Sequence, residues 1–452
     1  MKHAQTLLQS ADFISARQKM ADAICQTAER VRRDGIKPSA VEYREQYEAA
    51  IRQFQKERGR DLYYPILTSG IGGGPFVELQ DGSVKLDMIT GIGINFFGHA
   101  HPAYVEESLL AATSDVMQGN LQPGYEAQEL LHELVLSAAP KSRIEHGWLT
   151  TCGTMANEIA LKIVRQKRTP ATKIFAFTDC FAGRSTAMQE ITDNPKYRDG
   201  QPIYGEVHYL PFYDEARSLS DNIECTVGHM RWMLDRYPGK FAAIMSELVQ
   251  GEGGFSSAPR EFFVAVFEEA HKHKLAVWID EVQTFGRTGE LFAFQKLGIE
   301  SLVDVVTVGK LLQACAVLYT NEFNPKPGLV AGTFSGSATA LRTARRTLKM
   351  LKEDGFLGAN GKIEKLSARF ASHLRSQAKV PVRAVGGMIA FQPYGGTMDD
   401  VKKTLMKLFD LGVIAFSCGH GPYWVRMLPP LGVMTEAEVD LVCQKVQEAL
   451  SS

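Results

Sequence analysis

The sequence of 452 residues lacks the features that mark several large classes of protein. It has no uninterrupted apolar run close to the roughly 20 residues that a membrane-spanning helix needs. Its net charge is -1, so it also lacks the basic excess that is typical of a domain that binds nucleic acid. We therefore expect neither a membrane nor a nucleic acid as a partner.

Cysteine is scarce and scattered along the chain. The seven cysteines are an odd number, and no two of them form a Cys-x-x-Cys pair. Such a pattern argues against a disulfide framework and favours a reducing compartment. We expect the protein to be cytoplasmic.

Residues 1–35 lack the apolar core of a secretory signal. Their arginines could indicate an organellar transit peptide, but Asp12, Asp22 and Glu29 argue against one. We expect an amphipathic helix that leads into the fold.

The features that are present are typical of a soluble globular protein, with 45% hydrophobic and 22% charged residues. The chain is longer than the roughly 250 to 300 residues at which a single hydrophobic core stops growing. We therefore expect two domains of unequal size.

Short apolar runs alternate with amphipathic helices from about Gly147 onward, and they predict a mostly parallel, doubly wound α/β sheet. The runs are GWLTT, KIFAFT, FAAIMSE, LAVWID, VDVVTVGK and AVLYT. A hairpin is expected over Pro75–Met88, and a small α+β unit is expected near the carboxyl end. In doubly wound sheets ligands bind beyond the carboxyl ends of the strands, so residues at those ends are the first site candidates.

Two of the predicted strands end in ionisable side chains, Asp280 and Lys310. Burying an ammonium group is costly unless it is paired or its pKa falls, and a lysine of lowered pKa suits Schiff-base chemistry. The alternatives are a solvated lysine at a strand end, which is the commoner case, and an aspartate that caps a turn or helix. For the neighbouring Glu281 we expect a structural ion pair or cap.

Two other strand ends suit a planar, phosphorylated ligand. A Gly-Thr turn at Gly153 and Thr154 opens a predicted helix, and the N–H groups of a helix amino terminus suit a phosphate dianion. Phe181 could stack on a planar ring, and Arg184 could pair with a carboxylate. Alone, Thr154 is equally typical of a helix N-cap, and Phe181 and Arg184 of a surface loop. Together with the lysine and the aspartate they predict a site for pyridoxal 5'-phosphate.

The sequence resembles the class III aminotransferases, which have fold type I of the pyridoxal-phosphate enzymes. The resemblance extends in order from about Gly72 to the carboxyl end, and it is carried by GIGINFFGHAHP, SELVQGEGGF, DEVQTFGRTGELFAFQ, the Gly-Lys of the strand end, GTFSGS and VRMLPPLGVMTEAEVD. It implies a helical segment over 1–75 that packs on the small domain and on a dimer partner, a large cofactor-binding domain over 76–342, and a small α+β domain over 343–452.

The resemblance also implies roles for single residues. Lys310 looks like the lysine that bonds to the cofactor's aldehyde and moves the proton, and Asp280 like the partner of the ring nitrogen. Gln283 resembles the residue that contacts the ring hydroxyl, and Phe181 the residue that stacks on the ring. The phosphate contacts correspond to Gly153, Thr154 and Thr333 of the partner subunit. We therefore expect a homodimer with shared sites.

Three positions suggest the substrates. Arg184 is similar to the arginine that holds a carboxylate of glutamate or 2-oxoglutarate in ornithine, acetylornithine and lysine 6-aminotransferases. Glu252 resembles the glutamate that pairs with a mobile arginine, whose place Arg426 takes. We expect an ω-aminotransferase that transfers an amino group from an ω-amino acid or amine to 2-oxoglutarate by a ping-pong mechanism. Met155 and Ala182 depart from the residues common in relatives, so the amino donor stays open.

The sequence alone leaves other functions open. The same scaffold could serve an aminomutase, a racemase or a decarboxylase, or a non-catalytic relative that binds the cofactor. His99 and His101 could be ligands of a metal hydrolase, but no further ligand set stands at the strand ends. We expect no metal.

Overall fold

The computed structural model describes residues 2–451, which divide into two compact units. Unit 1 contains the residues up to Thr113, Lys365–Ser417 and the residues from Pro422, and unit 2 contains Ser114–Glu364 and Cys418–Gly421.

The division by contacts differs from the ranges expected from the sequence. Residues 76–113 belong to unit 1, because β3 (Val84–Asp87) pairs in parallel with β15 (Val413–Ile414). The helix α12 (Ala338–Glu353) belongs to unit 2, where it packs against α6 (Tyr125–Ala138). The packing of residues 1–75 on a dimer partner stays a prediction.

Unit 2 is built on a seven-stranded sheet of the described residues, in the order β5-β11-β10-β9-β8-β6-β7. All strands pair in parallel except β11, which is antiparallel to both neighbours. The bounds are β5 Ile144–Thr150, β6 Lys173–Phe177, β7 Val207–Leu210, β8 Phe241–Ser246, β9 Ala276–Glu281, β10 Val305–Val308 and β11 Cys315–Thr320. The predicted α/β class and its six strands are confirmed. The edge strand β7 was missed because its side chains are only half-buried, so its apolar run is short.

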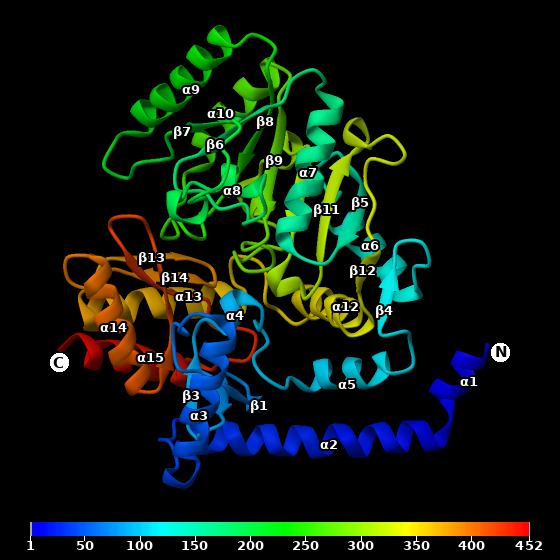
Figure 1. The fold of residues 1–452 in the computed structure, drawn as a ribbon, viewed down its shortest axis with the longest axis vertical. Helices are drawn as coiled ribbons and strands as arrows, with labels where there is room; N and C mark the ends of the chain where they lie inside the picture. Colours follow the sequence, from blue (N-terminus) through cyan, green and yellow to red (C-terminus); the bar gives the residue numbers. More distant parts are fainter. Residues whose placement is uncertain (1, 452) are drawn as a thin grey trace. The chain divides into compact units, whose positions relative to one another are not determined.

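Helices cover both faces of this sheet (Figure 1). The helix α7 packs across β5, β10 and β11, whereas α10 packs on β8 and β9 together with α9. Apart from α6 and α12, whose bounds are given above, the remaining helices of unit 2 are short. The bounds are α7 Gly153–Lys167, α8 Met188–Ile191, α9 Leu219–Arg236, α10 Arg260–Lys272 and α11 Ala293–Leu297, with 3-10 turns at Pro195–Tyr197, Glu300–Leu302, Lys310–Leu312 and Asn321–Phe323.

The carboxyl ends of six strands, β5, β6, β7, β8, β9 and β10, lie at one edge of the sheet. The register pairs Asp280 with Thr307, three residues before Lys310. It also pairs Thr150, the last residue of β5, with Cys315, the first residue of β11. The predicted site residues at these ends are therefore brought to the same edge.

Unit 1 contains two four-stranded sheets, β1-β2-β3-β15 and β13-β14-β17-β16. The predicted hairpin over Pro75–Met88 is confirmed, because β2 and β3 pair antiparallel. The bounds are β1 Thr68–Gly73, β2 Phe76–Leu79, β13 Val382–Val385, β14 Met388–Phe391, β16 Phe416–Cys418, β17 Trp424–Met427, α1 His3–Gln9, α2 Ala11–Asp34, α3 Val41–Arg58, α4 Thr90–Gly93, α5 Pro102–Ala111, α13 Lys362–His373, α14 Met398–Asp410 and α15 Glu436–Ser451, with a π-helical turn at Leu374–Ala378.

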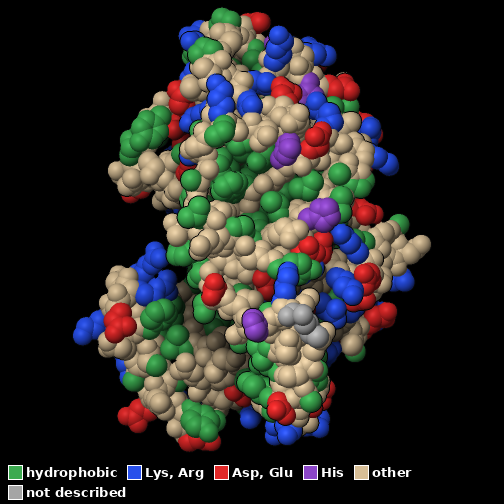
Figure 2. All heavy atoms as spheres, turned by 90° about the vertical axis from the view of Figure 1, so that its right-hand side faces the viewer, with side chains coloured by type: hydrophobic (Ala, Val, Ile, Leu, Met, Phe, Trp, Pro, Cys, Tyr) green, Lys and Arg blue, Asp and Glu red, His purple; other side chains and the backbone are tan. Residues whose placement is uncertain are grey.

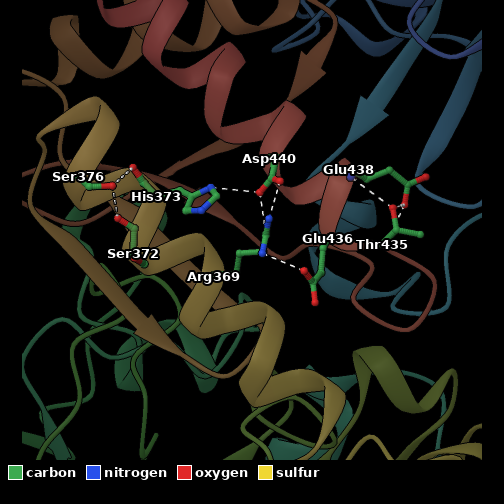
Figure 3. A network of polar contacts seen from close by, with 8 residues as sticks. All are labelled: Arg369, Ser372, His373, Ser376, Thr435, Glu436, Glu438 and Asp440. Carbon is green, nitrogen blue, oxygen red and sulfur yellow. Dashed lines mark hydrogen bonds and ion pairs between the residues drawn. The ribbon is translucent and has the colours of Figure 1, made fainter.

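A polar network joins α13 to α15 (Figure 3). The guanidinium of Arg369 donates to both carboxylate oxygens of Asp440, at 2.7 and 2.6 Å, and to Glu436 at 2.8 Å. The ring of His373 lies 3.1 Å from Asp440. The groups are partly exposed, so this planar, two-pronged contact is expected to add little stability.

Within residues 2–451 no helix is both long and apolar enough to span a membrane.

Candidate active site

Asp280 is a buried carboxylate at the end of β9, and its two oxygens have different partners. Oδ1 accepts a hydrogen bond from the Val282 N–H at 2.8 Å, which is the turn contact that the alternative interpretation expected. Oδ2 accepts a hydrogen bond from the Asn157 side chain at 2.7 Å. Burial raises the pKa of Asp280, although both hydrogen bonds and the charge of Lys310 act to lower it. Ionised Asp280 is therefore a buried negative charge that a cationic partner would stabilise.

Lys310 follows β10 and begins a 3-10 turn with a φ of 46°, a left-handed conformation that is uncommon outside glycine. The preceding Gly309 leaves no room for a side chain, because an added Cβ would lie 2.9 Å from the Cys315 sulfur. Lys310 is half-buried, and its charge acts on Asp280 and Glu247. This environment differs from that of a solvated lysine at a strand end.

Glu247, at the end of β8, is a second buried carboxyl group beside Asp280. Its oxygens accept hydrogen bonds from the backbone N–H groups of Phe181, at 2.8 Å, and Gly251, at 3.0 Å. Burial and then the nearby charge of Asp280 raise the pKa of Glu247 to about 8. Burial and the neighbouring carboxylate therefore favour the protonated form of Glu247.

Asn157, on α7, was not recognised from the sequence as a site residue. Its amide donates to Asp280 Oδ2 and to the Ala182 carbonyl, at 2.7 and 2.8 Å, and its oxygen accepts from the Thr307 hydroxyl at 2.8 Å. All polar groups of this buried amide are used, so its orientation is fixed. The available signal was a polar residue on the otherwise apolar face of a helix.

The amino terminus of α7 lies at the same edge. Its N-cap is Cys152, and in the described chain no side chain caps the first turn. The alternative role of Thr154 as an N-cap is therefore wrong, because Thr154 is already inside the helix. An added Cβ on Gly153 would lie 2.7 Å from a Val282 methyl group, and one on Gly183 would lie 2.5 Å from the Thr154 hydroxyl. These glycines let the first turn of α7 pack closely against Val282 and against the loop of Gly183. The uncapped N–H groups of that turn are the donors that an anion site requires.

Gln283 is buried, and its Oε1 has no hydrogen-bond partner among residues 2–451. A Cβ on Gly251 would lie 2.6 Å from this oxygen, so the glycine backbone packs directly on the amide. A buried amide that lacks a partner is costly unless a ligand supplies one. This matches the predicted contact of Gln283 with a ring hydroxyl.

Phe181 and Arg184 lie on the loop that follows β6. Phe181 is half-buried, and Arg184 is exposed, as the surface-loop alternative expected. Arg184 nevertheless has a defined place, because its guanidinium carbon lies 3.7 Å from the centre of the Tyr197 ring.

Three predicted residues remain, and their positions differ. Glu252 is half-buried, and its carbonyl accepts from the Gly419 N–H at 2.7 Å. Thr333 is exposed, just before β12 (Phe334–Ser337), and its carbonyl accepts from the Asn120 N–H at 3.2 Å. Arg426 belongs to unit 1, where it is buried on β17 with its guanidinium 5.4 Å from the Phe416 ring.

Glu281 is buried next to Asp280, but strand alternation directs it to the opposite face. It accepts hydrogen bonds from the Thr284 hydroxyl and from the Phe294 N–H at the start of α11. The expectation of a structural cap is confirmed. Burial raises the pKa of Glu281 to about 7.

The raised pKa of Glu281 predicts a pH dependence of stability. The unfolded carboxyl ionises near 4.5, whereas the folded one keeps its proton to about pH 7. Its contribution to stability is therefore complete below the lower value and is lost as pH rises to the upper one, at about 1.4 kcal/mol per pH unit. Glu281→Gln, which cannot ionise, is expected to flatten the dependence of the free energy of unfolding in urea on pH between about pH 5 and 7. An unchanged slope would show that Glu281 is already ionised in the folded protein.

His99 and His101 have structural partners. His99 lies 3.1 Å from an Asp87 oxygen, and His101 accepts from the Ala103 N–H at the start of α5. Among the described residues no group of three or more His, Cys, Asp or Glu could hold a metal ion.

The residues at the sheet edge fit pyridoxal 5'-phosphate. The uncapped turn at Gly153 and Thr154 suits its phosphate, and the partnerless Gln283 oxygen suits its ring hydroxyl. Asp280, buried and held by Asn157, suits a protonated ring nitrogen, and Lys310 suits its aldehyde.

Comparisons with known proteins agree with this fit. The family model Aminotransferase class-III matches residues 65–450. The acetylornithine aminotransferase of Bacillus subtilis (strain 168) is 31% identical over 392 residues, which cover 84% of this chain and 93% of that protein. The diaminobutyrate–2-oxoglutarate transaminase of Bordetella bronchiseptica is 28% identical over 417 residues, which cover 87% of this chain and 93% of that protein.

Solved structures show the same fold. The lysine aminotransferase from M. tuberculosis aligns with a TM-score of 0.78 at 22% identity, covering 89% of this chain and 99% of that one. The ornithine aminotransferase from Toxoplasma gondii ME49 aligns with a TM-score of 0.75 at 22% identity, covering 88% and 94%. The family match spans most of the sequence and includes every residue of the cluster. The chain therefore belongs to the class III aminotransferases, transaminases that use pyridoxal 5'-phosphate.

Proposed function

We propose that this transaminase uses 2-oxoglutarate as amino acceptor and an ω-amino acid or amine as donor, in a ping-pong cycle. The observation that carries the proposal is the position of Arg184. Its exposed guanidinium follows Gly183, which packs on the first turn of α7, and Arg184 could therefore bind a carboxylate close to the cofactor site. The diaminobutyrate–2-oxoglutarate transaminase named above is a relative whose name includes this acceptor.

The chemistry divides between the cofactor and the chain. When bound, pyridoxal 5'-phosphate supplies an aldehyde that takes up the amino group and a ring that withdraws electrons from the reacting carbon. We assign Lys310 Nζ to the covalent attachment and to carrying the proton between substrate carbons. Asp280 would hold a proton on the ring nitrogen, and we assign Glu252 and Arg426, each in its own unit, to recognition of the substrates.

A screen of half-reactions tests the donor. Ornithine, lysine, 4-aminobutyrate and diamines are added singly to the purified holoenzyme, and the cofactor's absorbance is followed. The proposal expects a spectral change with at least one ω-amino compound and its reversal by 2-oxoglutarate. A change that 2-oxoglutarate does not reverse would favour an aminomutase or a decarboxylase.

Substitution of Arg184 tests the acceptor. Arg184→Gln is expected to raise KM for 2-oxoglutarate by roughly 10- to 100-fold, the effect of losing a charged hydrogen-bond pair. KM for pyruvate, which has one carboxylate, should change little. The matched control is Arg236→Gln on α9, an arginine that also packs on an aromatic ring, and it should leave both constants unchanged. A uniform loss with both acceptors would contradict a carboxylate-binding role.

We propose that the active form is a homodimer in which Thr333 of the partner subunit reaches the phosphate. The support is an exposed apolar surface around β4 (Met117–Gly119) and β12, next to Thr333. It consists of Val116, Met117, Leu121, Tyr125 and Phe334, which are between 41 and 94% exposed. Hydrophobic side chains also gather across the face shown in Figure 2. Apolar patches of this kind mark interfaces between proteins, and sedimentation equilibrium measures the assembly.

We also propose a cytoplasmic location. All seven cysteines are free thiols in the structure, which agrees with a reducing compartment.

A further inference from the structure

We propose that Tyr197 is a positioning residue for Arg184 and thereby sets the preference for dicarboxylate acceptors. The inference rests on the proposed use of 2-oxoglutarate and adds a residue to it. Tyr197 ends the 3-10 turn Pro195–Tyr197 and lies 13 residues beyond Arg184 in the chain.

The Tyr197 ring contacts two side chains of the neighbouring loop. The Arg184 guanidinium carbon is 3.7 Å from its centre, which is the distance of direct stacking. The Phe181 ring meets it edge to face, with centres 6.2 Å apart and planes at 89°. One tyrosine thus contacts both the residue expected to stack on the cofactor and the residue expected to bind the substrate.

The turn that carries Tyr197 is held rigidly. The Asn194 side chain accepts from the Lys196 N–H at 3.1 Å, and its carbonyl accepts from the Tyr197 N–H at 3.0 Å. On the other side, the Arg198 guanidinium donates to the Thr192 carbonyl and to the Tyr209 hydroxyl, at 2.9 and 3.1 Å. The backbone that carries the ring is therefore held from both ends of the turn.

The loop that carries Arg184 is fastened to the same segment. The buried Thr192 hydroxyl accepts from the N–H groups of Ala182 and Gly183, at 2.9 and 3.2 Å, and donates to the Gly183 carbonyl at 2.9 Å. This uses the full hydrogen-bonding capacity of a hydroxyl group. Because these bonds join the two segments, the backbones that carry Arg184 and Tyr197 are held close to each other.

Stacking has a specific consequence for an arginine. A guanidinium that lies over a ring keeps its N–H donors free in its own plane, where a carboxylate binds with two parallel hydrogen bonds. It also gives up side-chain freedom before the ligand arrives, so less entropy is lost on binding. Without the ring, Arg184 would keep its charge but lose its orientation. That loss weakens binding of the second carboxylate of 2-oxoglutarate and leaves the reacting end of the substrate unaffected.

The test compares Tyr197→Leu with the matched control Tyr197→Phe, which keeps the ring. In Tyr197→Leu, KM for 2-oxoglutarate and the dissociation constant of glutarate, a non-reacting dicarboxylate measured by calorimetry, are expected to rise about 3- to 30-fold. The kcat and KM for pyruvate should stay within about twofold, as should all constants of Tyr197→Phe. In an Arg184→Gln background, Tyr197→Leu should have no further effect on glutarate binding, because the residue acts through Arg184.

Three results would overturn the inference: equal losses with pyruvate and 2-oxoglutarate, a Tyr197→Phe variant as impaired as Tyr197→Leu, or additive effects of the Arg184 and Tyr197 substitutions. Failure of the proposed function has a different signature. In that case the unsubstituted holoenzyme itself would neither bind glutarate nor consume 2-oxoglutarate.

Discussion

Replacing Lys310 by alanine is expected to stop transamination with every donor, with a fall in turnover of about 10⁴-fold or more. Two functions are lost together, because the same amine is assigned both the covalent attachment of the cofactor and the movement of the proton. Borohydride reduction followed by mass spectrometry measures the first function directly. The unsubstituted protein should retain the mass of the cofactor on the peptide that contains Lys310, and the variant should retain none.

Lys310→Arg separates chemistry from electrostatics. A guanidinium keeps the positive charge beside Asp280 and Glu247, but it stays protonated and cannot act as a nucleophile. We therefore expect this variant to be as inactive as Lys310→Ala but closer to the unsubstituted protein in stability. Lys272→Ala, on the exposed side of α10, controls for loss of a surface lysine and should be fully active. Substantial activity in either Lys310 variant would refute the assignment.

The parts of the site that could be predicted from the sequence are those that local patterns determine. Asp280 and Lys310 each follow an apolar run, and the strands of a doubly wound sheet present their carboxyl ends at one edge. Gly153 stands where a strand pattern changes to a helix pattern, and α7 does begin there. The alternation of strands and helices and the edge that carries the site therefore follow from spacing, whereas β7 was missed and the reversed direction of β11 was not predicted.

The parts that were missed depend on contacts between distant residues. Asn157 reaches Asp280, 123 residues away, and no local pattern identifies that partner. In the sequence Tyr197 is an ordinary turn residue, and only its contact with Arg184 in the folded chain marks it as a site residue. The pairing of β3 with β15, near the far end of the chain, is likewise a contact that no local pattern identifies. Periodicity reports which face of an element is buried, and it says nothing about what that face meets.

Asp280→Asn is expected to lower turnover by roughly 10²- to 10³-fold while leaving the cofactor bound. The substitution keeps the shape of the side chain but removes the charge, and loss of one member of a buried ion pair costs about 3–5 kcal/mol. The phosphate turn and Lys310 are untouched, so the cofactor should still be detected by its absorbance after gel filtration. Full activity in this variant would remove Asp280 from the mechanism, and loss of the cofactor would assign it a binding role instead.

Two further substitutions test whether the loss of turnover is specific to the Asp280 side chain. Glu281→Gln removes the adjacent buried carboxyl group, which faces α11, and it should leave turnover near that of the unsubstituted protein. Asn157→Ala removes the donor to Asp280 Oδ2 without removing the charge, and hydrogen bonds to charged groups contribute about 1.5–3 kcal/mol, so turnover should fall by roughly 10- to 100-fold. In the Asp280→Asn background, Asn157→Ala should cost much less, because its main partner no longer carries a charge. If the two losses instead multiply, Asn157 acts through the Ala182 carbonyl and the loop of Phe181 and not through Asp280.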